Sequence, residues 1–224
     1  MSKCDNLFEF FCGVTLLGRV RIKFCGITNL RDALDADCLG VDALGFVFYK
    51  PSPRYIAPLV AAQIIEKLSP FVSTVGLFVN ATHQEVSEIS ELTKIDVLQY
   101  HGDESPEYCE SSSSPWIKAL RVGGDVDITG EVLRFRNAKA ILFDSYDVEK
   151  RGGTGTSFDW SLLPVQVTCP TILAGGLNSK NIGNAIRHVE PSCVDVSGGI
   201  ESSKGVKDRE KMKDFVAEVN KLDI

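Results

Sequence analysis

The sequence predicts a single α/β barrel, because eight short strand-like runs alternate with eight helical patterns from Arg21 to the end of the chain. Eight near-equal units favour a closed parallel (β/α)8 TIM barrel over an open doubly wound sheet. A chain of 224 residues with ordinary apolar content can bury one core of that size, and no linker interrupts it. We therefore expect a barrel domain over residues 20–224, preceded by an extension over residues 1–19.

The extension contains two apolar patches, residues 7–11 and 14–17. Glu9 breaks the first patch, and the segment has neither a basic leader nor a small-residue cleavage site, so we expect no signal peptide. No run in the chain approaches the roughly 20 apolar residues of a membrane span.

The first predicted strand, residues 21–25, alternates between two faces. Ile22 and Phe24 share an apolar face, whereas Lys23 and Cys25 share the other, just before Gly26. The remaining strands follow at regular intervals. We expect them at residues 43–48, 74–79, 95–101, 116–122, 140–144, 171–175 and 194–197.

The predicted helices carry recognisable start signals. Thr28 or Asn29 can cap the first helix, Pro58 can open the second, and 82–85 has the capping-box form. Ser105 with Pro106 starts another, and Asn178 is expected to cap the helix that runs through Ile186. The apolar stripes expected to face the sheet include Val60, Ile64, Ile65 and Leu68; Val86, Ile89 and Leu92; Ile128, Val132 and Phe135; and Met212, Phe215, Val216, Val219 and Leu222. A short helix is expected over 158–163 and the last over 208–222.

Composition narrows the possible partners. A net charge of -6 and a pI near 5.2 argue against nucleic acid or an anionic membrane as the main partner. The seven cysteines are an odd number, with no C-x-x-C pair and no His pair at metal spacing. This pattern indicates reduced thiols in a cytoplasmic protein without structural zinc.

Polar residues collect where the predicted strands end. In a parallel barrel the active site lies at the carboxyl ends of the strands. The side chains expected to converge there are Lys23, Cys25, Gln99, His101, Asp144, Asp195 and Ser197. Each residue alone is an ordinary core or capping residue, so their convergence carries the interpretation.

Two glycine pairs follow the seventh and eighth strands. They are Gly175 with Gly176, and Gly198 with Gly199 after Ser197. Paired glycines let the backbone approach an anion, and nearby helix amino ends offer free N–H groups, so these loops predict a phosphate site. Such a site binds phosphate without a net positive charge on the protein.

Two further loops could border this site. Arg54 lies in a proline-stiffened loop after the second strand and could bind a carboxylate through its forked guanidinium. The glycine-rich run 152–155 lacks the context of a dinucleotide fingerprint or a P-loop, and we interpret it as a loop near the phosphate.

Seven short motifs follow one another along the chain. They are KFCGIT at 23–28, GFVF at 45–48 with SPR at 52–54, VGLFV at 75–79, LQYHGDE at 98–104, FD at 143–144 with GGTG at 152–155, LAGGL at 173–177 and DVSGGIE at 195–201. With these motifs the chain resembles the phosphoribosylanthranilate isomerase family of tryptophan biosynthesis, in order from about Val20 to the end. Two features depart from the family: Tyr100 stands where leucine is common, and the leading residues have no counterpart.

The resemblance implies an Amadori rearrangement of a phosphosugar without metal or cofactor. It implies that Asp144 is the general acid and Cys25 the general base. It also implies that Arg54 holds the substrate carboxylate, that the two glycine loops hold the phosphate, and that His101 and Asp195 are supports. The resemblance further implies a monomer or a homodimer.

These residue types suit the implied tasks. A thiol titrates near 8.5 unperturbed, so Lys23 on the same strand face would help to form a thiolate at Cys25. An acid must keep its proton, so we expect burial to raise the pKa of Asp144.

Other readings of the site stay open at this stage. Related phosphate-binding barrels such as indole-glycerol-phosphate synthase or ribulose-phosphate epimerase would show a Lys/Glu pair or His/Asp metal ligands instead of Cys25 and Asp144. A non-catalytic phosphosugar-binding barrel would need the glycine loops alone. A thiol redox sensor would need a second cysteine near Cys25, and none is close in sequence.

Overall fold

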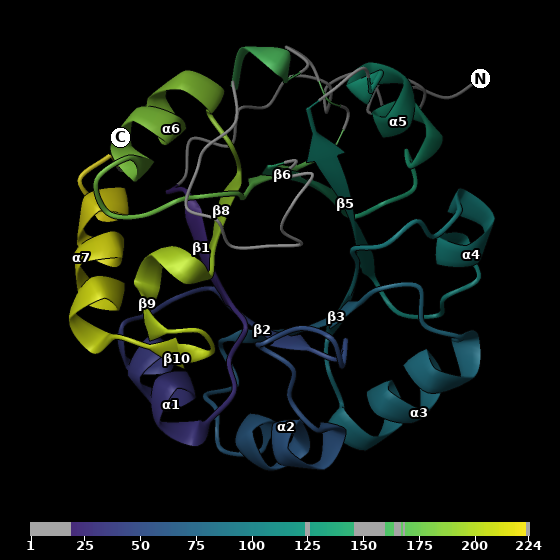
Figure 1. Cartoon of the computed structure of the whole chain (residues 1–224), viewed down its shortest axis with the longest axis horizontal. Coiled ribbons are helices and arrows are strands. Elements are labelled where there is room, and N and C mark those ends of the chain that lie inside the picture. The colour runs from purple at the N-terminus through teal and green to yellow at the C-terminus, as the bar shows by residue number, and fades with distance from the viewer. Residues whose placement is uncertain (1–18, 124–125, 146–159, 164–166, 168, 223–224) are drawn as a thin grey trace, which may run out of the picture.

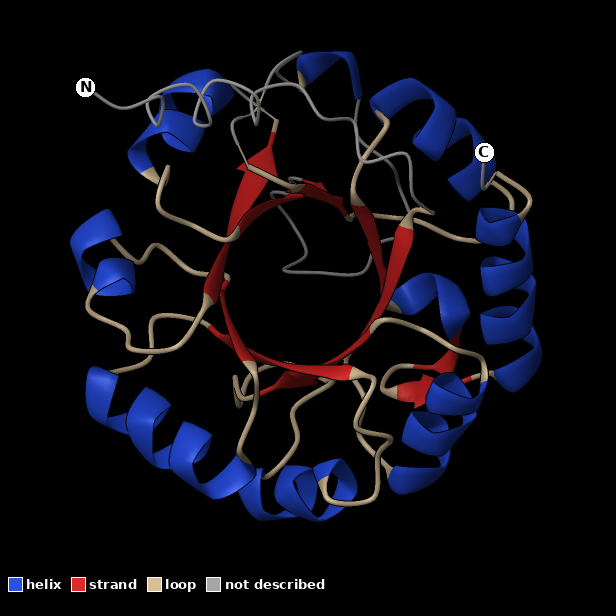
Figure 2. Cartoon of the chain, turned by 180° about the vertical axis from the view of Figure 1, so that it is seen from behind, coloured by secondary structure: helices blue, strands red, loops and turns tan. Residues whose placement is uncertain are grey.

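A computed structural model describes residues 19–123, 126–145, 160–163, 167 and 169–222. Within these residues, eight parallel strands pair in chain order, and β8 pairs with β1 to close the barrel. Helices form a ring outside the strands (Figures 1 and 2). The predicted fold class is therefore confirmed. The expected extension, apart from Arg19, and the glycine-rich run 152–155 lie outside the described residues.

The barrel strands match the expected positions to within two residues at each end. They are β1 (Arg21–Cys25), β2 (Ala43–Val47), β3 (Ser73–Phe78), β4 (Val97–Tyr100), β5 (Trp116–Val122), β6 (Ala140–Ser145), β7 (Thr171–Leu173) and β8 (Cys193–Val196). The helices between them are α1 (Leu30–Cys38), α2 (Pro58–Ile65), α3 (His83–Thr93), α4 (Pro106–Glu110), α5 (Ile128–Arg134), η2 (Trp160–Leu162), α6 (Ile182–Val189) and α7 (Arg209–Asn220).

Most of the helix start signals act as expected. Asn29 accepts a hydrogen bond from the backbone N–H of Asp32, and Pro58 stands at the start of α2. Thr82 and Glu85 form the reciprocal capping box, and Ser105 caps α4. These caps satisfy backbone donors that would otherwise be left without partners at each helix start.

The prediction that Asn178 caps α6 is wrong. The helix begins at Ile182 with Asn181 as its N-cap. The backbone carbonyl of Asn178 accepts from the N–H groups of Asn181 and Ile182, while its side chain accepts from the N–H of Lys180. Asn178 therefore closes a turn ahead of the helix.

Two residues of the predicted apolar stripes face outward. Val60 of α2 is 42% exposed and Leu92 of α3 is 48% exposed. The inner face of α2 is made by Ala61 and Ile64 instead. Apolar residues at helical spacing run over an arc wider than the buried contact, and its edges stay in water.

The core has two layers separated by the strands. Phe24, Leu44, Ile141 and Phe215 belong to the larger layer, between strands and helices. Smaller side chains fill the barrel interior. These are Ile117, Ala119, Ala140, Leu142, Ile172 and Ala174, with Val97 and Cys193. The interior is thus packed below the strand ends, and a third, small cluster of Cys25, Val47 and Leu77 lies at the carboxyl ends of β1, β2 and β3.

A short hairpin between β8 and α7 was not predicted. After β8 come the 3-10 turn η3 (Gly198–Ile200) and two antiparallel strands, β9 (Glu201–Ser203) and β10 (Val206–Lys207). Gly205 has a φ of +82°, the left-handed conformation that favours glycine in such a turn. Its carbonyl accepts from the Thr28 hydroxyl, so the hairpin is attached to the loop after β1.

Among the described residues, no helix is both long and apolar enough to cross a membrane.

Candidate active site

Cys25 ends β1 and faces the barrel interior. Its register neighbour on β2 is Gly45, where a Cβ atom would lie only 2.9 Å from the Cys25 Sγ and 3.1 Å from the Lys23 Nζ. The Cys25 thiol and the Lys23 ammonium group therefore both lie over Gly45. Both side chains are buried, as expected from the alternation of β1.

Lys23 is paired with Asp195 across the β1–β8 boundary. Its Nζ donates to Asp195 Oδ1 at 2.9 Å, and the two residues are register partners. Burial alone would lower the pKa of Lys23, but the charges of Asp195 and Cys25 outweigh it, and the net shift is upward. Lys23 thus remains a cation inside the barrel.

Burial raises the pKa of the Cys25 thiol. Lys23 opposes this shift, as expected from the sequence, whereas Asp195 reinforces it. The predicted help from Lys23 is therefore present, but it does not prevail over desolvation in the protein without substrate.

Asp144 lies near the end of β6 and contacts His101, which follows β4. His101 Nε2 is 3.2 Å from Asp144 Oδ2, and the amide Nε2 of Gln99 is 3.0 Å from His101 Nδ1. The Gln99 amide and the Asp144 carboxyl group therefore contact the two ring nitrogens of His101, one on each side. The Asp144 side chain is 22% exposed.

The two glycine loops lie against each other. A Cβ at Gly199 would come within 1.9 Å of the Leu177 carbonyl oxygen, so only glycine allows this approach. Gly175 and Gly176 have φ values of +84° and +65°. The side-chain amide of Asn181 donates to the Gly176 carbonyl at 3.0 Å. The structure therefore brings the predicted phosphate loops together at one side of the mouth.

Arg54 lies beside this mouth but is already paired. Its Nε and Nη2 donate to Glu201 Oε1 and Oε2 at 2.7 and 2.8 Å, and both residues are buried. Its Cδ would lie 2.6 Å from a Cβ on Gly26, so the side chain crosses the turn directly after Cys25. A protein carboxylate therefore occupies one edge of the guanidinium that we predicted to bind a substrate carboxylate.

Sequence reasoning missed Lys207, the second cation on Glu201. Its Nζ donates to Glu201 Oε1 at 2.9 Å and to the Cys25 carbonyl oxygen at 2.6 Å. Lys204-Gly205 is a signal for the turn of the hairpin, but nothing local in the sequence indicates that Lys207 contacts Glu201.

Two other thiols are poor candidates for a base, the buried Cys109 and the partly buried Cys193. Burial raises the pKa of both Cys109 and Cys193 to about 12. Cys109 belongs to the layer outside the strands, and Cys193 packs in the barrel interior below Asp195. Among the described residues, no group of three His, Cys, Asp or Glu side chains could hold a metal ion.

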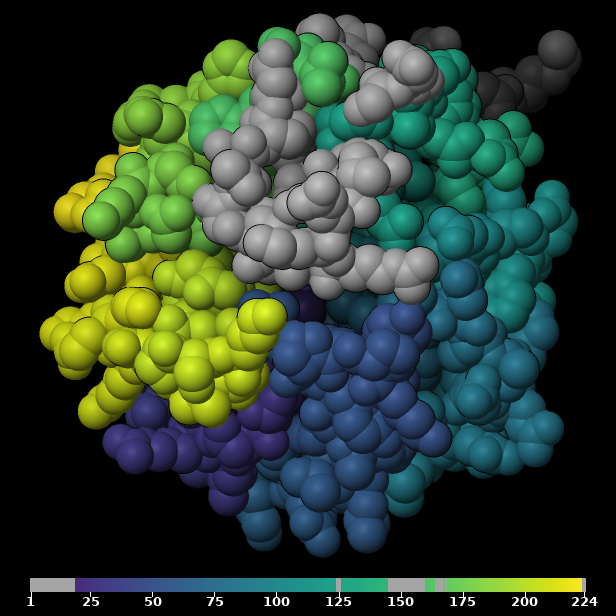
Figure 3. Space-filling model, in the orientation of Figure 1, coloured from purple at the N-terminus to yellow at the C-terminus, as the bar shows by residue number. Residues whose placement is uncertain are grey.

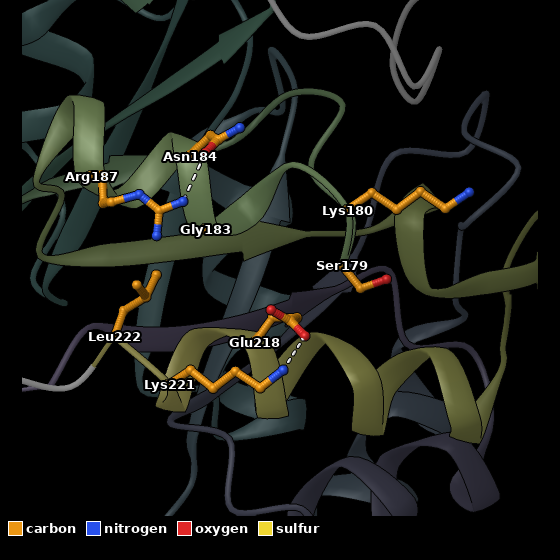
Figure 4. A pocket seen from close by; sticks show the side chains of 8 residues that line it. All are labelled: Ser179, Lys180, Gly183, Asn184, Arg187, Glu218, Lys221 and Leu222. Carbon is orange, nitrogen blue, oxygen red and sulfur yellow. Dashed lines mark hydrogen bonds and ion pairs between the residues drawn. The ribbon is translucent and has the colours of Figure 1, made fainter.

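A surface groove of about 340 Å³ lies between α6 and α7, outside the barrel (Figure 4). Its polar lining includes Arg187, which donates to Asn184, and Lys221, which pairs with Glu218. None of its lining residues is one of the predicted site residues.

Comparison with known proteins gives a consistent result. The family model described as N-(5'-phosphoribosyl)anthranilate isomerase matches residues 22–218. The protein of that name from Hahella chejuensis is 52% identical over 201 residues, which are 90% of this chain and 94% of the relative.

Solved structures agree. Phosphoribosylanthranilate isomerase from Thermotoga maritima is 40% identical, with a TM-score of 0.84, over 91% of this chain and 100% of that one. A structure of the same enzyme type in complex with reduced 1-(o-carboxyphenylamino)-1-deoxyribulose 5-phosphate is 39% identical, with a TM-score of 0.81 and the same coverage.

Proposed function

The chain belongs to the N-(5'-phosphoribosyl)anthranilate isomerase family, and from that membership we propose that Cys25 and Asp144 are the base and the acid of its reaction. The protein is an isomerase of tryptophan biosynthesis. It converts N-(5-phosphoribosyl)anthranilate into 1-(2-carboxyphenylamino)-1-deoxyribulose 5-phosphate. This Amadori rearrangement moves hydrogen between carbon atoms C2 and C1 of the sugar.

Asp144 acts first, on the furanose ring. Its carboxyl proton passes to the ring oxygen while the C1–O bond breaks, and the anilino nitrogen lone pair forms a C1=N iminium. The contact with His101, itself held by Gln99, supports this role because it fixes the direction in which the carboxyl group points.

Cys25 then acts on the opened chain. Its thiolate removes the proton from C2, the C–H electrons form a C1=C2 bond, and the nitrogen becomes neutral. The resulting enolamine tautomerises to the ketone. The positive iminium forms beside a thiol that also faces Lys23, and both positive charges favour the thiolate in the step that needs it.

Substrate contacts come from three loops. The backbones at Gly175, Gly176 and 197–199 bind the phosphate, and Arg54 binds the anthranilate carboxylate. Asp195 supports the site through Lys23 rather than by touching the substrate. The observation that carries the proposal is the position of Cys25 and Asp144 at the ends of β1 and β6, beside the joined glycine loops.

The remaining features follow from this activity. A base that must stay reduced supports a cytoplasmic location. We retain residues 20–224 as the catalytic domain and 1–19 as an extension outside it. The oligomeric state is a monomer or a homodimer, and light scattering on the purified protein separates the two.

The roles are tested with Cys25→Ala and Asp144→Asn. Each variant should lose turnover by about a thousandfold while binding the reduced product analogue as tightly as the wild type. Near-normal turnover in either variant would refute the role of that residue.

A further inference from the structure

One edge of the Arg54 guanidinium is already hydrogen-bonded within the protein. Glu201 occupies its Nε and Nη2 edge with two short hydrogen bonds of 2.7 and 2.8 Å. Five N–H donors are available on a guanidinium, and this pairing takes two of them. The donors on Nη1 and the second donor on Nη2 stay available for another carboxylate.

The Arg54 side chain is more accessible to solvent than its partner Glu201, as we expect if one edge of the guanidinium faces the site. The Arg54 side chain keeps 11% of its surface accessible, against 5% for the Glu201 side chain. The Arg54 stem is also confined, because it crosses Gly26 at the turn after Cys25. The confined stem and the two hydrogen bonds to Glu201 limit the direction in which the remaining edge can point.

A third residue, Lys207, determines the net charge of the cluster that Arg54 and Glu201 form. Arg54 and Glu201 alone are a neutral pair, which gives little attraction for a further carboxylate. Lys207 Nζ donates to Glu201 Oε1 at 2.9 Å, and its side chain has no accessible surface. The ion pair with Glu201 favours a protonated Lys207, so the three side chains together carry a net charge of about +1, which matches a single carboxylate. Two further charges border the cluster and offset each other, because Asp32 accepts from the Lys207 backbone N–H and Lys211 Nζ donates to the Glu201 carbonyl oxygen, both at 2.7 Å.

The protonation state of Glu201 is consistent with that sum. Burial alone would raise the pKa of Glu201, but hydrogen bonds from Arg54 and Lys207 outweigh it and hold the pKa below its usual range. Burial lowers the pKa of Lys207, and Glu201 opposes that shift. Glu201 is therefore ionised at neutral pH.

The cluster is held by parts of the chain that are far apart in sequence. Gly205 of the hairpin would place a Cβ 3.0 Å from the Pro53 carbonyl oxygen, so the hairpin lies directly against the loop of Arg54. In Figure 3 the yellow segment after β8 touches the blue segment after β2. Lys207 also donates to the Cys25 carbonyl oxygen at 2.6 Å, so the cluster of Arg54, Glu201 and Lys207 contacts β1, the strand that ends in Cys25.

We propose that Glu201 and Lys207 are positioning residues that make Arg54 a receptor for one carboxylate, the one on the aromatic ring of the substrate. The proposal rests on the role of Arg54 given above. Glu201 fixes the direction of the guanidinium, and Lys207 restores the positive charge that Glu201 removes. Neither residue touches the substrate.

The test compares two ligands, the reduced product analogue and the same compound without its carboxylate, by calorimetry on the full chain. Glu201→Gln should weaken binding of the carboxylated ligand by at least about tenfold and change binding of the other ligand by less than about twofold. Lys207 Nζ also donates to the Ser197 carbonyl oxygen at 3.3 Å, next to the proposed phosphate site, so Lys207→Met should weaken both ligands, but the carboxylated one by about tenfold more. Glu201→Asp, which keeps the charge, should recover part of the loss.

Glu104→Gln is the matched control. Glu104 pairs with Lys118 at 2.7 Å, and both side chains are at least as buried as Glu201, but they lie outside this cluster. This variant should be less stable without any change in the preference for the carboxylated ligand. If Glu201→Gln does not fold, Glu201→Asp and Lys207→Met provide the same comparison.

The outcomes separate the two proposals. Arg54→Gln should abolish the preference for the carboxylated ligand; if it does not, the proposed role of Arg54 is wrong. If it does, while the Glu201 and Lys207 variants weaken both ligands equally or neither, the positioning role alone is wrong. Tighter binding of the carboxylated ligand by Glu201→Gln would also overturn it, because Glu201 would then compete with the substrate.

Discussion

Lys23 and Asp195 are register partners on β1 and β8, and their side chains form a 2.9 Å ion pair inside the barrel, immediately below Cys25. The thiol therefore lies next to a cation whose effect is partly cancelled by its own counter-ion. Removing either member of the pair should change both the reactivity of Cys25 and the stability of the barrel.

The first prediction concerns the reactivity of Cys25. Lys23 lowers the pKa of the thiol and Asp195 raises it, so Lys23→Met should raise that pKa. Less thiolate is then present at any given pH, and the acidic limb of the kcat/KM profile moves to higher pH. Alkylation of Cys25 by iodoacetamide, followed by mass spectrometry of its peptide across pH, measures the shift. An unchanged or lower pKa would show that Lys23 does not act on the thiol.

The second prediction concerns stability. Lys23→Met leaves Asp195 buried without its partner, which should reduce the free energy of unfolding by about 3 kcal/mol or more. Adding Asp195→Asn removes the stranded charge, so the double variant should recover most of that loss. Urea unfolding of the two single variants, the double variant and the wild type measures the cycle. Additive losses would mean that the two side chains are not coupled.

The third prediction concerns the support of Asp144. His101→Ala removes the ring that contacts the carboxyl group, and kcat should fall by about tenfold to a hundredfold with little change in KM. His83 is the control because it is exposed on α3, where it stacks on Tyr108. His83→Ala should leave steady-state kinetics unchanged. A wild-type kcat in His101→Ala would show that His101 does not support Asp144.

The fourth prediction concerns Gly45. Its substitution by alanine would place a Cβ 2.9 Å from the Cys25 Sγ, so the thiol must move and kcat should fall by about a hundredfold. Gly183 in α6 is a suitable comparison, because its nearest neighbour would lie 3.6 Å from the added Cβ. Gly183→Ala should keep full activity and gain up to about 1 kcal/mol of stability. Normal turnover in Gly45→Ala would show that the thiol tolerates displacement.

Local signals were sufficient to predict most of the fold. Alternation located the inward face of β1, and the caps at Asn29, Thr82 and Ser105 formed as predicted, because these depend on neighbours within a few residues. Asn178 was misassigned because a polar residue near a helix start can cap the helix or close the preceding turn, and both patterns look alike in sequence.

Long-range pairing could not be predicted in the same way. The sequence indicated Arg54 as a carboxylate ligand, but nothing near it shows that Glu201, 147 residues later, holds the guanidinium. Lys207 was missed for the same reason, because its partners lie on β1 and in the loop after β8. Only barrel closure brings these segments together, so charge balance at the site depends on the tertiary structure.

The assignment of Cys25 as the base at the end of β1 is tested by following anthranilate-type fluorescence when the purified protein meets freshly made N-(5-phosphoribosyl)anthranilate. The wild type should remove the signal rapidly, and Cys25→Ala should not, although it still binds the reduced product analogue. Equal rates of loss in the two proteins would contradict the role of Cys25, and no loss in either would contradict the activity itself.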